Sequence, residues 1–377
     1  MSTDWVIDSA QGTELTVGGR PVTSFASANY LSFEPPCTCR SPAFGGRQTL
    51  GLPGFLARDA DSAALEQTLA GWLGRPGAIL GKSTFHLLVD LMTTARGLGP
   101  VMVHRDSYVL TRLAARVLGA SAVTPFGSVQ EARRLIAAAS VGGAPARRRS
   151  PSLFLDGWSL RGALPPLADL AVLATRAGGR LVVDDTQALG VLGRRLDEPL
   201  ARGLPLGSGG TGTPAFLGVP TDSTIVVASL GKAFGVPLAF AAGPRSWVQR
   251  LRSRGPLVRA SSQAPLAAVR AARQALAWNY NAGDAARQRL TAAVAQLRSA
   301  AIIEGVPHSP VQRWVLPKLA QAHALWQALF DAGIWCLLER ERRAGGALTF
   351  LLTAAHEGPA TARTVAKLQS LRGERSW

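Results

Sequence analysis

Cysteine and long apolar runs are scarce in this sequence, and each scarcity excludes a class of protein. The 377 residues include three cysteines, Cys37, Cys39 and Cys336, which are too few for a disulfide framework. Cys37-Thr-Cys39 has no second Cys/His pair at zinc spacing, so we expect no metal site. No apolar run approaches the roughly 20 residues that span a bilayer, and no leader of basic and apolar residues opens the chain. We therefore expect a cytoplasmic protein with no membrane partner.

Lysine is scarce too, although the chain is strongly basic. Four of the 41 basic residues are lysines, and the formal net charge is +17. The arginines are dispersed, with short runs at 147–149 and 340–343, and no stretch interleaves aromatic with basic side chains. We expect no nucleic-acid partner; a positive surface suits an anionic substrate or an acidic carrier protein.

The order of apolar runs predicts an α/β protein. Hydrophobic residues make up 47% of a chain that is long enough for a large core and two lobes. Short apolar runs alternate with helical patterns, which is typical of βαβ units and a mainly parallel sheet. The expected strands are 78–80, 101–104, 152–155, 180–185, 224–229 and 238–242.

Helical patterns lie between these strands, at 65–73, 110–118 and 166–177, and Asp61 and Ser62 can cap the first of them. From 247 to about 278 the pattern is continuously helical, and a smaller α+β segment follows. The glycine-rich stretch 207–214 interrupts the alternation and predicts a flexible loop or lid.

Gly81-Lys-Ser-Thr84 follows an apolar run and mimics part of a nucleotide-binding P-loop. The P-loop pattern G-x-x-x-x-G-K-[ST] needs an earlier glycine, because that glycine opens the turn around the phosphates. Pro76 stands at this position, and Gly74 and Gly77 are out of register. A P-loop ATPase is therefore the outlier among our hypotheses.

Three residues occupy strand ends, where an α/β sheet binds ligands. Lys232 follows an expected strand, and burial there would lower the pKa of its amine and favour imine formation. Asp184 ends the preceding strand, and Tyr108 opens a helix. Pyridoxal 5'-phosphate (PLP) needs such a set: a lysine for a Schiff base, a carboxylate for the pyridine nitrogen and an aromatic ring against it. Taken singly, each residue also suits an ordinary surface, capping or packing role.

In this order the residues resemble the α-oxoamine synthases, PLP enzymes of the fold-type-I aminotransferase superfamily that condense an amino acid with an acyl thioester. The resemblance covers most of the chain. Its segments are Ala28-Asn-Tyr-Leu31, Val183-Asp-Asp-Thr-Gln-Ala-Leu-Gly-Val-Leu-Gly193, Ala228-Ser-Leu-Gly-Lys-Ala-Phe-Gly235 and Thr353-Ala-Ala-His356. They are similar to the family's N-Y-L-G, V-D-E-A-H-S-x-G-V-L-G, T-L-[SG]-K-A-F-G and S-A-A-H.

The resemblance implies a mainly parallel seven-stranded sheet sandwiched by helices and a smaller α+β C-terminal domain. Residues 1–45 would be an N-terminal arm of the small domain, 46–255 the large PLP-binding domain and 256–377 the small domain. It also implies a homodimer with the active site near the subunit interface, because Ser261-Ser-Gln-Ala-Pro265 resembles the family's S-T-x-x-P segment near the cofactor.

The resemblance gives each site residue an expected role. Lys232 would be the Schiff-base lysine, Asp184 the partner of the pyridinium and Tyr108 the stacking ring; these three are the expected catalytic residues. The other expected cofactor-binding residues are Gln187, Ser229, Ser83, Thr84, Phe85, Ser159 and Ser262.

Three positions depart from the family. Tyr108 and Gln187 stand where it has histidines, and neither side chain can shuttle protons near neutral pH. Thr349 aligns with the arginine that grips the substrate carboxylate, so that bidentate clamp is missing. We expect weak binding of glycine, alanine and serine, and an amine substrate that is anchored elsewhere or lacks a free α-carboxylate. Candidate anchors are Arg340, Arg342 and Arg343.

The sequence thus predicts a PLP-dependent transferase with an altered amine or amino-acid-derived substrate and an acyl-CoA or acyl carrier protein as acyl donor. An aminotransferase, decarboxylase or lyase on the same fold is the alternative. A silent scaffold is a weaker hypothesis, because Lys232 and Asp184 are both present.

Overall fold

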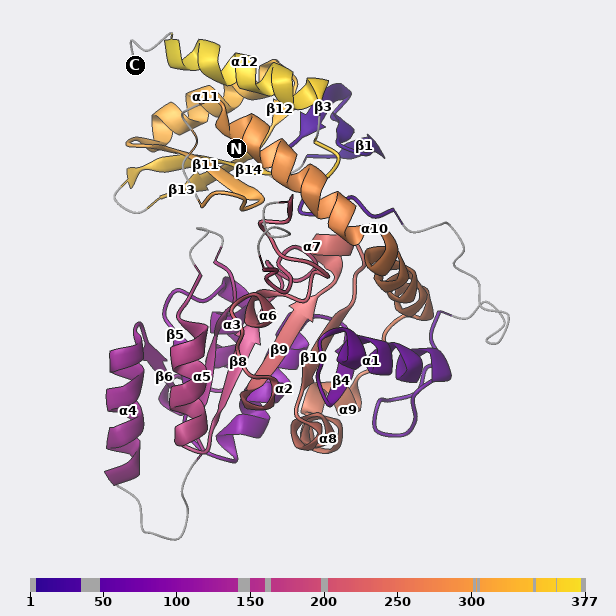
Figure 1. The fold of residues 1–377 in the computed structure, drawn as a ribbon, viewed down its shortest axis with the longest axis vertical. Coiled ribbons are helices and arrows are strands. Elements are labelled where there is room, and N and C mark those ends of the chain that lie inside the picture. Colours follow the sequence, from indigo (N-terminus) through magenta and orange to yellow (C-terminus); the bar gives the residue numbers. More distant parts are fainter. Residues whose placement is uncertain are drawn as a thin grey trace.

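Two lobes make up the structure, a large one and a small one, drawn below and above in Figure 1. The computed structural model describes residues 5–34, 48–141, 150–159, 164–197, 203–300, 303, 306–341, 344–356 and 358–373. Cys37, Cys39 and the arginines at 147–149 fall outside these ranges, whereas Cys336 is a free, buried thiol. None of the described helices is long and apolar enough to cross a membrane.

A seven-stranded sheet forms the centre of the large lobe, as the resemblance implied. Its strands are β4 (Gly77–Gly81), β5 (Val101–His104), β6 (Val123–Phe126), β7 (Ser152–Asp156), β8 (Arg180–Asp184), β9 (Thr224–Ser229) and β10 (Ala239–Gly243). They lie in the order β4-β10-β9-β8-β7-β5-β6, and β10 alone runs antiparallel to its neighbours. The other six strands point the same way, so their carboxyl ends share one edge of the sheet.

Six of these strands agree with the expected ranges to within one residue, and β6 was not expected. Its sequence, Val-Thr-Pro-Phe, contains Pro125, which argues against a strand in sequence reasoning. The proline is tolerated because β6 lies at the edge of the sheet, where one side of the strand needs no ladder partner.

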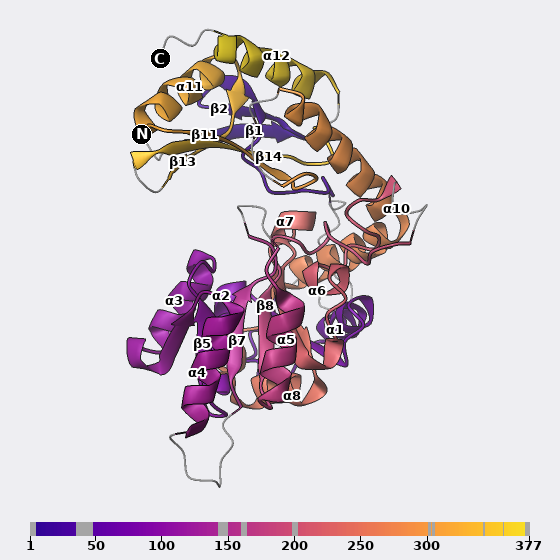
Figure 2. The same cartoon turned by 60° about the vertical axis from the view of Figure 1, so that its left-hand side comes forward.

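Helices cover both faces of the central sheet, because its strands are apolar on both sides. Val182 packs in one hydrophobic cluster with residues of α2 and α8, and its neighbour Val183 packs in another with residues of α4 and α5. Figure 2 shows α4 and α5 side by side on their face. The helices of the large lobe are α1 (Ala60–Trp72), α2 (Thr84–Arg96), α3 (Val109–Val117), α4 (Val129–Val141), α5 (Leu167–Arg176), α6 (Thr213–Phe216), α7 (Gly231–Phe234), α8 (Arg245–Arg254) and α9 (Pro256–Ala260), with 3-10 turns at Ala120–Ala122 and Thr221–Ser223.

Two expectations about helices were wrong in detail. The cap of α1 is Asp59, whose Oδ1 accepts a hydrogen bond from the Ser62 amide at 2.8 Å, while Asp61 lies inside the helix. The helical stretch expected from 247 to 278 is divided, since α8 ends at Arg254 and α10 (Leu266–Arg298) begins after Pro265. Helix α10 contacts α1 in the large lobe and α12 in the small one, and Figure 1 shows it running between the lobes.

The small lobe brings the two ends of the described chain together. β3 pairs in parallel with β12, so the N-terminal strands share a sheet with the C-terminal part. A second sheet has the order β11-β14-β13 and packs against α11. The elements are β1 (Ile7–Gln11), β2 (Glu14–Val17), β3 (Arg20–Ser24), β11 (Val311–Leu316), α11 (Leu319–Asp331), β12 (Ile334–Trp335), β13 (Leu337–Arg340), β14 (Gly346–Leu351) and α12 (Pro359–Gly373).

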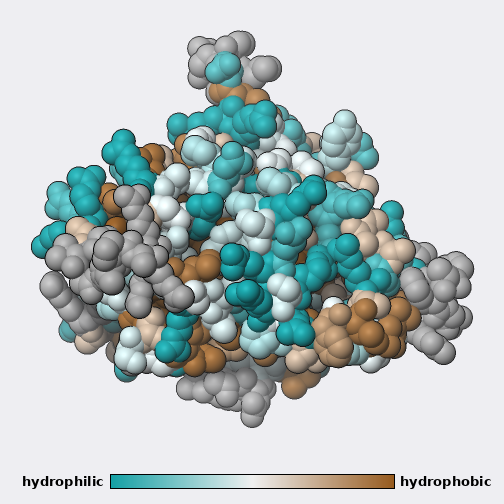
Figure 3. All heavy atoms as spheres, turned by 90° about the horizontal axis from the view of Figure 1, so that it is seen from below, coloured by the Kyte–Doolittle hydropathy of each residue, from teal (hydrophilic) through white to brown (hydrophobic). Residues whose placement is uncertain are grey.

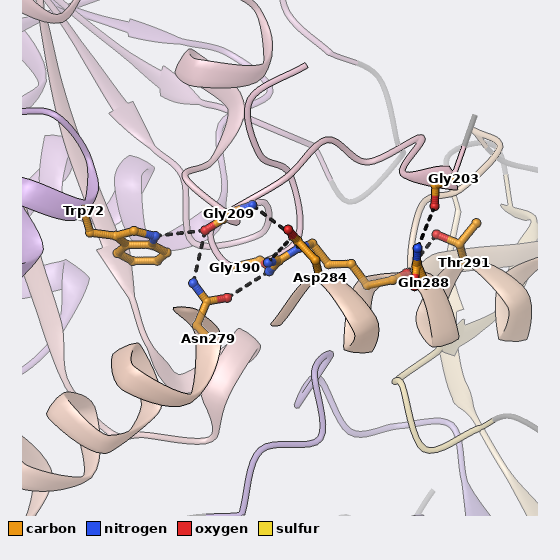
Figure 4. Close-up of polar contacts among 9 residues, drawn as sticks. Trp72, Gly190, Gly203, Gly209, Asn279, Asp284, Gln288 and Thr291 are labelled. Carbon is orange, nitrogen blue, oxygen red and sulfur yellow. Dashed lines mark hydrogen bonds and ion pairs between the residues drawn. The ribbon is translucent and has the colours of Figure 1, made fainter. Parts of the chain in front are cut away.

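The glycine-rich stretch 207–214 is fastened to the rest of the fold, contrary to the expectation of a flexible loop or lid. The Gly209 carbonyl accepts hydrogen bonds from Trp72 Nε1 at 2.9 Å and from Asn279 Nδ2 at 3.1 Å (Figure 4). The Gly209 amide donates to Asp284 Oδ1 at 3.0 Å. Polar groups of α1 and α10 therefore hold the stretch in one position.

The buried guanidinium of Arg287 completes this attachment. Its side chain is 1% exposed and donates to the Gly190 carbonyl at 2.7 Å and to Asn279 Oδ1 at 2.9 Å. It also bonds Asp284 Oδ1 at 2.6 Å. A Cβ on Gly210 would lie 2.7 Å from both this guanidinium and the Gly190 carbonyl, so no side chain fits there. Arg287 thus ties α10 to the loop that follows β8.

Replacing Arg287 by methionine should lower the free energy of unfolding by about 3 kcal/mol, because buried acceptors lose their donor. Urea unfolding followed by circular dichroism measures the change. Arg273→Met is the matched control on the same helix: that side chain is 48% exposed, and its ion pair with Asp61 should contribute less than about 1 kcal/mol. Equal losses in the two variants would contradict the role given to Arg287.

Candidate active site

The carboxyl edge of the central sheet brings several of the expected residues together. Asp156 at the end of β7 pairs in register with Asp184 at the end of β8. At the end of β9, Ser229 pairs with Ala239 of β10, which in turn pairs with Gly81 of β4. The segments that follow these strand ends therefore converge on one region of the large lobe.

Lys232 lies in α7, directly after β9, with its amine among polar partners. Its Nζ donates to Gln187 Oε1 at 2.9 Å and lies 5.4 Å from the centre of the Tyr108 ring. Burial lowers the pKa of Lys232, while the charges of Asp184 and Asp156 act in the opposite direction. A lowered pKa raises the fraction of neutral amine, which is the nucleophilic form.

Asp184 presents a buried carboxylate beside this amine. The side chain is 7% exposed, and its Oδ1 accepts from the Thr186 amide at 3.1 Å and from Thr186 Oγ1 at 2.6 Å. Burial raises the pKa of Asp184, and the Thr186 bonds and the Lys232 charge oppose that shift. In the described part of the chain no hydrogen bond ends at its second oxygen, Oδ2.

Thr186 is a site residue that sequence reasoning missed. Besides holding Asp184, its Oγ1 accepts from the Ser229 amide at 3.1 Å and so joins the ends of β8 and β9. Its place in the Val183–Gly193 segment, two residues after Asp184, was the available signal. Ser229 in turn accepts at its Oγ from the Gly231 amide at 3.0 Å, in the turn before Lys232.

Gln187 is fixed between two groups. Its Oε1 accepts from Lys232 and its Nε2 donates to the Tyr30 hydroxyl at 2.5 Å. Tyr30 is 1% exposed, burial raises its pKa, and its backbone amide donates to the Lys232 carbonyl at 2.8 Å. Gln187 and Tyr30 thus orient the lysine from both ends.

Tyr108 and Asp156 also lie near the Lys232 amine. Tyr108 precedes α3, its ring is 41% exposed, and its amide donates to Asp156 Oδ2 at 2.7 Å. Asp156 Oδ1 is buried with no hydrogen-bond partner in the described structure. Burial, followed by the charge of Asp184, raises the pKa of Asp156 to about 7. Sequence reasoning missed Asp156 because the expected strand stopped one residue before it.

The start of α2 offers an anion-binding turn near the same edge. Ser83 caps the helix, because its Oγ accepts from the His86 amide at 3.4 Å and lies 2.7 Å from His86 Nδ1. Thr84 and Phe85 open the first turn, where backbone amides can bind an anion. Lys82 Nζ donates to Ser262 Oγ at 2.8 Å, so Ser262 lies within reach of this turn.

No described hydrogen bond joins the Ser159 side chain to this group of residues. Ser159 lies three residues beyond the end of β7. Its expected role beside the cofactor ring stays a prediction.

Asp185, the residue after Asp184, connects the site to the 207–214 stretch. It is 0% exposed, and its Oδ2 accepts from the Thr213 amide at 2.9 Å. A Cβ on Gly212, which has φ +90°, would lie 1.9 Å from that oxygen, so the carboxyl group fills the space beneath the 207–214 stretch. Burial raises the pKa of Asp185 to about 7.

Known proteins share this sequence and this fold. Residues 160–356 match the family described as aminotransferase class I and II. The 8-amino-7-oxononanoate synthase of Nitrosococcus oceani is 28% identical, over 96% of this chain and 95% of that protein. The enzyme of the same name from Acidithiobacillus ferrooxidans is 29% identical, over 90% of this chain and 85% of that protein.

Solved structures show the same fold at lower identity. A Sphingomonas wittichii serine palmitoyltransferase has a TM-score of 0.79 at 20% identity and covers 97% of this chain and 91% of its own. An 8-amino-7-oxononanoate synthase from Francisella tularensis has a TM-score of 0.69 at 17% identity, with 94% and 98% covered. These likenesses confirm the predicted fold and leave no support for the P-loop hypothesis.

The raised pKa of Asp185 makes stability depend on pH. The folded state holds this proton up to about pH 7, whereas the unfolded group releases it near 3.8, so the free energy of unfolding falls as pH rises between these values. The largest slope for one group is about 1.4 kcal/mol per pH unit.

Asp185→Asn should remove this group's share of the slope in urea unfolding between pH 5 and 7. Glu131→Gln is the control, since the Arg105 ion pair lowers the pKa of Glu131 to about 2; a slope that Asp185→Asn leaves unchanged would refute the assignment.

Proposed function

The chain belongs to the aminotransferase class I and II family and is a PLP-dependent enzyme, and from that premise we propose that it joins an acyl thioester to an amine or amino-acid-derived substrate. The names of its relatives support this proposal: two are 8-amino-7-oxononanoate synthases, and a serine palmitoyltransferase shares the fold. The single observation that carries it is that Gln187 and Tyr108 both lie against the buried amine of Lys232.

The residues present fit PLP. Asp184, a buried residue, could offer its Oδ2 to a protonated ring nitrogen, whose positive charge would offset the cost of burying the carboxylate. Asp156 Oδ1 and Ser107 Oγ are buried and unpartnered within the described structure, so polar groups of a ligand could satisfy them. The first turn of α2 suits a phosphate.

Each residue then has a definable task. PLP, when bound, supplies an electron sink for a carbanion. Asp184 would keep the ring nitrogen protonated, and Tyr108 would be the aromatic side chain against the cofactor ring. Lys232 Nζ, with its lowered pKa, can hold the cofactor and later take or return a proton at the substrate carbon. Gln187 orients that amine without exchanging protons itself.

We propose that residues 46–255 are the cofactor-binding domain and that 1–45 and 256–377 form the small domain. The pairing of β3 with β12 supports the assignment of the N-terminal arm. The short helix α9 follows this boundary but contacts α2 and α8 of the large lobe, and α10 reaches back to α1. An aminotransferase, decarboxylase or lyase would use the same cofactor residues, but would release no thiol from an acyl thioester.

Borohydride reduction of the PLP-loaded protein should attach the cofactor to Lys232, as peptide mass mapping would show. Asp184→Asn should keep this attachment while slowing thiol release from acyl-CoA, assayed with a panel of amines, by about a hundredfold or more, because an amide cannot keep the ring nitrogen protonated. Asp197→Asn, at an exposed carboxylate thirteen residues after Asp184, is a charge-matched control. Protein that takes up no PLP, or an Asp184→Asn variant with normal turnover, would refute the proposal.

We also propose a homodimer. Hydrophobic side chains occur in separate patches on the lower face of the molecule (Figure 3). Phe55 and Leu56 are 60% and 62% exposed. The Gly54 amide bonds the Ser261 carbonyl at 3.1 Å, so this exposed apolar pair lies beside Ser262, one of the expected cofactor-binding residues. A second copy covering the pair would remove it from water.

Phe55→Asp combined with Leu56→Asp should convert the dimer into a monomer, because two charges would be buried in the interface. Light scattering at micromolar concentration measures the mass. Tyr280→Asp, at a side chain 90% exposed on α10, is the control and should leave the dimer intact. A wild-type protein that is monomeric with PLP bound and activity intact would contradict the homodimer.

A further inference from the structure

A polar cluster lies on one face of the small-lobe sheet β11-β14-β13. Arg313 pairs in register with Thr349, and Thr349 pairs with Leu337, two residues before Glu339. Since alternate residues of a strand share a face, Arg313, Thr349 and Glu339 project to the same side. The opposite side packs against α11, where a Cβ on Gly346 would meet Ala322 at 2.5 Å. The cluster therefore faces away from α11, toward the large lobe in Figure 1.

A short stretch of chain and two backbone hydrogen bonds connect this face to the proposed active site. β14 carries Thr349 and leads to Ala354, whose amide donates to the Tyr30 carbonyl at 2.8 Å. The Tyr30 amide in turn donates to the Lys232 carbonyl at 2.8 Å. Ala354 is the fifth residue after Thr349, a distance of at most about 17 Å in an extended chain.

Arg313 is the arginine next to Thr349, but its charge is already taken. Its Nη2 forms ion pairs with Glu339, at 3.3 Å, and with Glu341, and its Nε donates to Thr349 Oγ1 at 3.4 Å. Thr349 Oγ1 donates to Glu339 Oε2 at 2.6 Å. The Arg313 and Glu341 side chains are 13% and 15% exposed. Arg313 is thus engaged by two carboxylates.

The candidate anchors named from sequence are not among the described partners of Arg313. Arg340 is exposed and alternates with Glu339 on β13, so it projects to the face opposite the cluster. Arg342 and Arg343 fall outside the described residues.

We infer that this cluster makes the substrate site discriminate against a free α-carboxylate and favour an amine whose carboxylate is absent or masked as an amide or ester. An incoming carboxylate would have to compete with Glu339 and Glu341 for the Arg313 guanidinium. An uncharged substituent escapes this cost. The inference rests on the proposed function, because it concerns the amine that reaches Lys232.

Calorimetric titration of the PLP-loaded protein with L-alanine and with L-alaninamide tests the inference. The two probes share an amine and a side chain and differ in the charge of the carboxyl group. The wild-type protein should bind L-alaninamide at least about tenfold more tightly. Glu339→Gln combined with Glu341→Gln frees Arg313 and should tighten binding of L-alanine at least about tenfold, which removes the preference.

Two further variants separate this explanation from a general change in charge. Adding Arg313→Gln to the double variant should abolish the gain for L-alanine. Glu14→Gln combined with Glu131→Gln removes two negative charges elsewhere and should leave both affinities unchanged. A wild-type protein that binds L-alanine as tightly as L-alaninamide would overturn the inference, and that comparison needs no variant to fold.

Failure of the inference and failure of the proposed function give different results. If borohydride attaches no PLP to Lys232, the proposed function fails. If PLP is attached and thiol is released from acyl-CoA, but L-alanine is the preferred amine, the proposed function holds and the inference alone fails.

Discussion

The burial of Lys232 beside Asp184 is the constraint on which the rest of the site depends. Each group loses water, and burial shifts the pKa of the lysine down and that of the aspartate up. The opposite charges of the two groups counter both pKa shifts, but only while the two side chains are held in place. Hydrogen bonds hold them: Thr186 binds the aspartate, and Gln187, itself bonded to Tyr30, binds the lysine.

The loop after β8 connects this pair of residues to more distant parts of the fold. Asp185 fills the space under the 207–214 stretch, and that stretch is bonded to α1 and α10. Arg287, from α10, closes the connection at the Gly190 carbonyl. A loop that looks mobile in sequence, because it is rich in glycine, is therefore a fitted part of the site: its glycines let backbone approach backbone and buried carboxylate.

Sequence predicted what depends on local order, and missed what depends on partners far along the chain. The strand ends that carry Asp184 and Lys232 could be read because apolar runs mark parallel strands and their ends mark ligand sites. β6 was missed because Pro125 breaks the local pattern. Arg313 could not be linked to Thr349, since they meet only through the register of β11 and β14.

The cofactor residues and the position that departs from the family's carboxylate clamp lie in different lobes. Residues that would hold the cofactor come from the carboxyl edge of the large sheet, where fixed strand register leaves little freedom. Thr349, which aligns with a carboxylate-binding arginine of the family that the sequence resembles, lies in the small lobe beside Arg313. Glu339 and Glu341 both pair with Arg313, so this arginine is not a ready substitute for the missing clamp. Our inference therefore assigns the discrimination against a carboxylate to the small lobe, whereas the residues that would hold the cofactor belong to the large one.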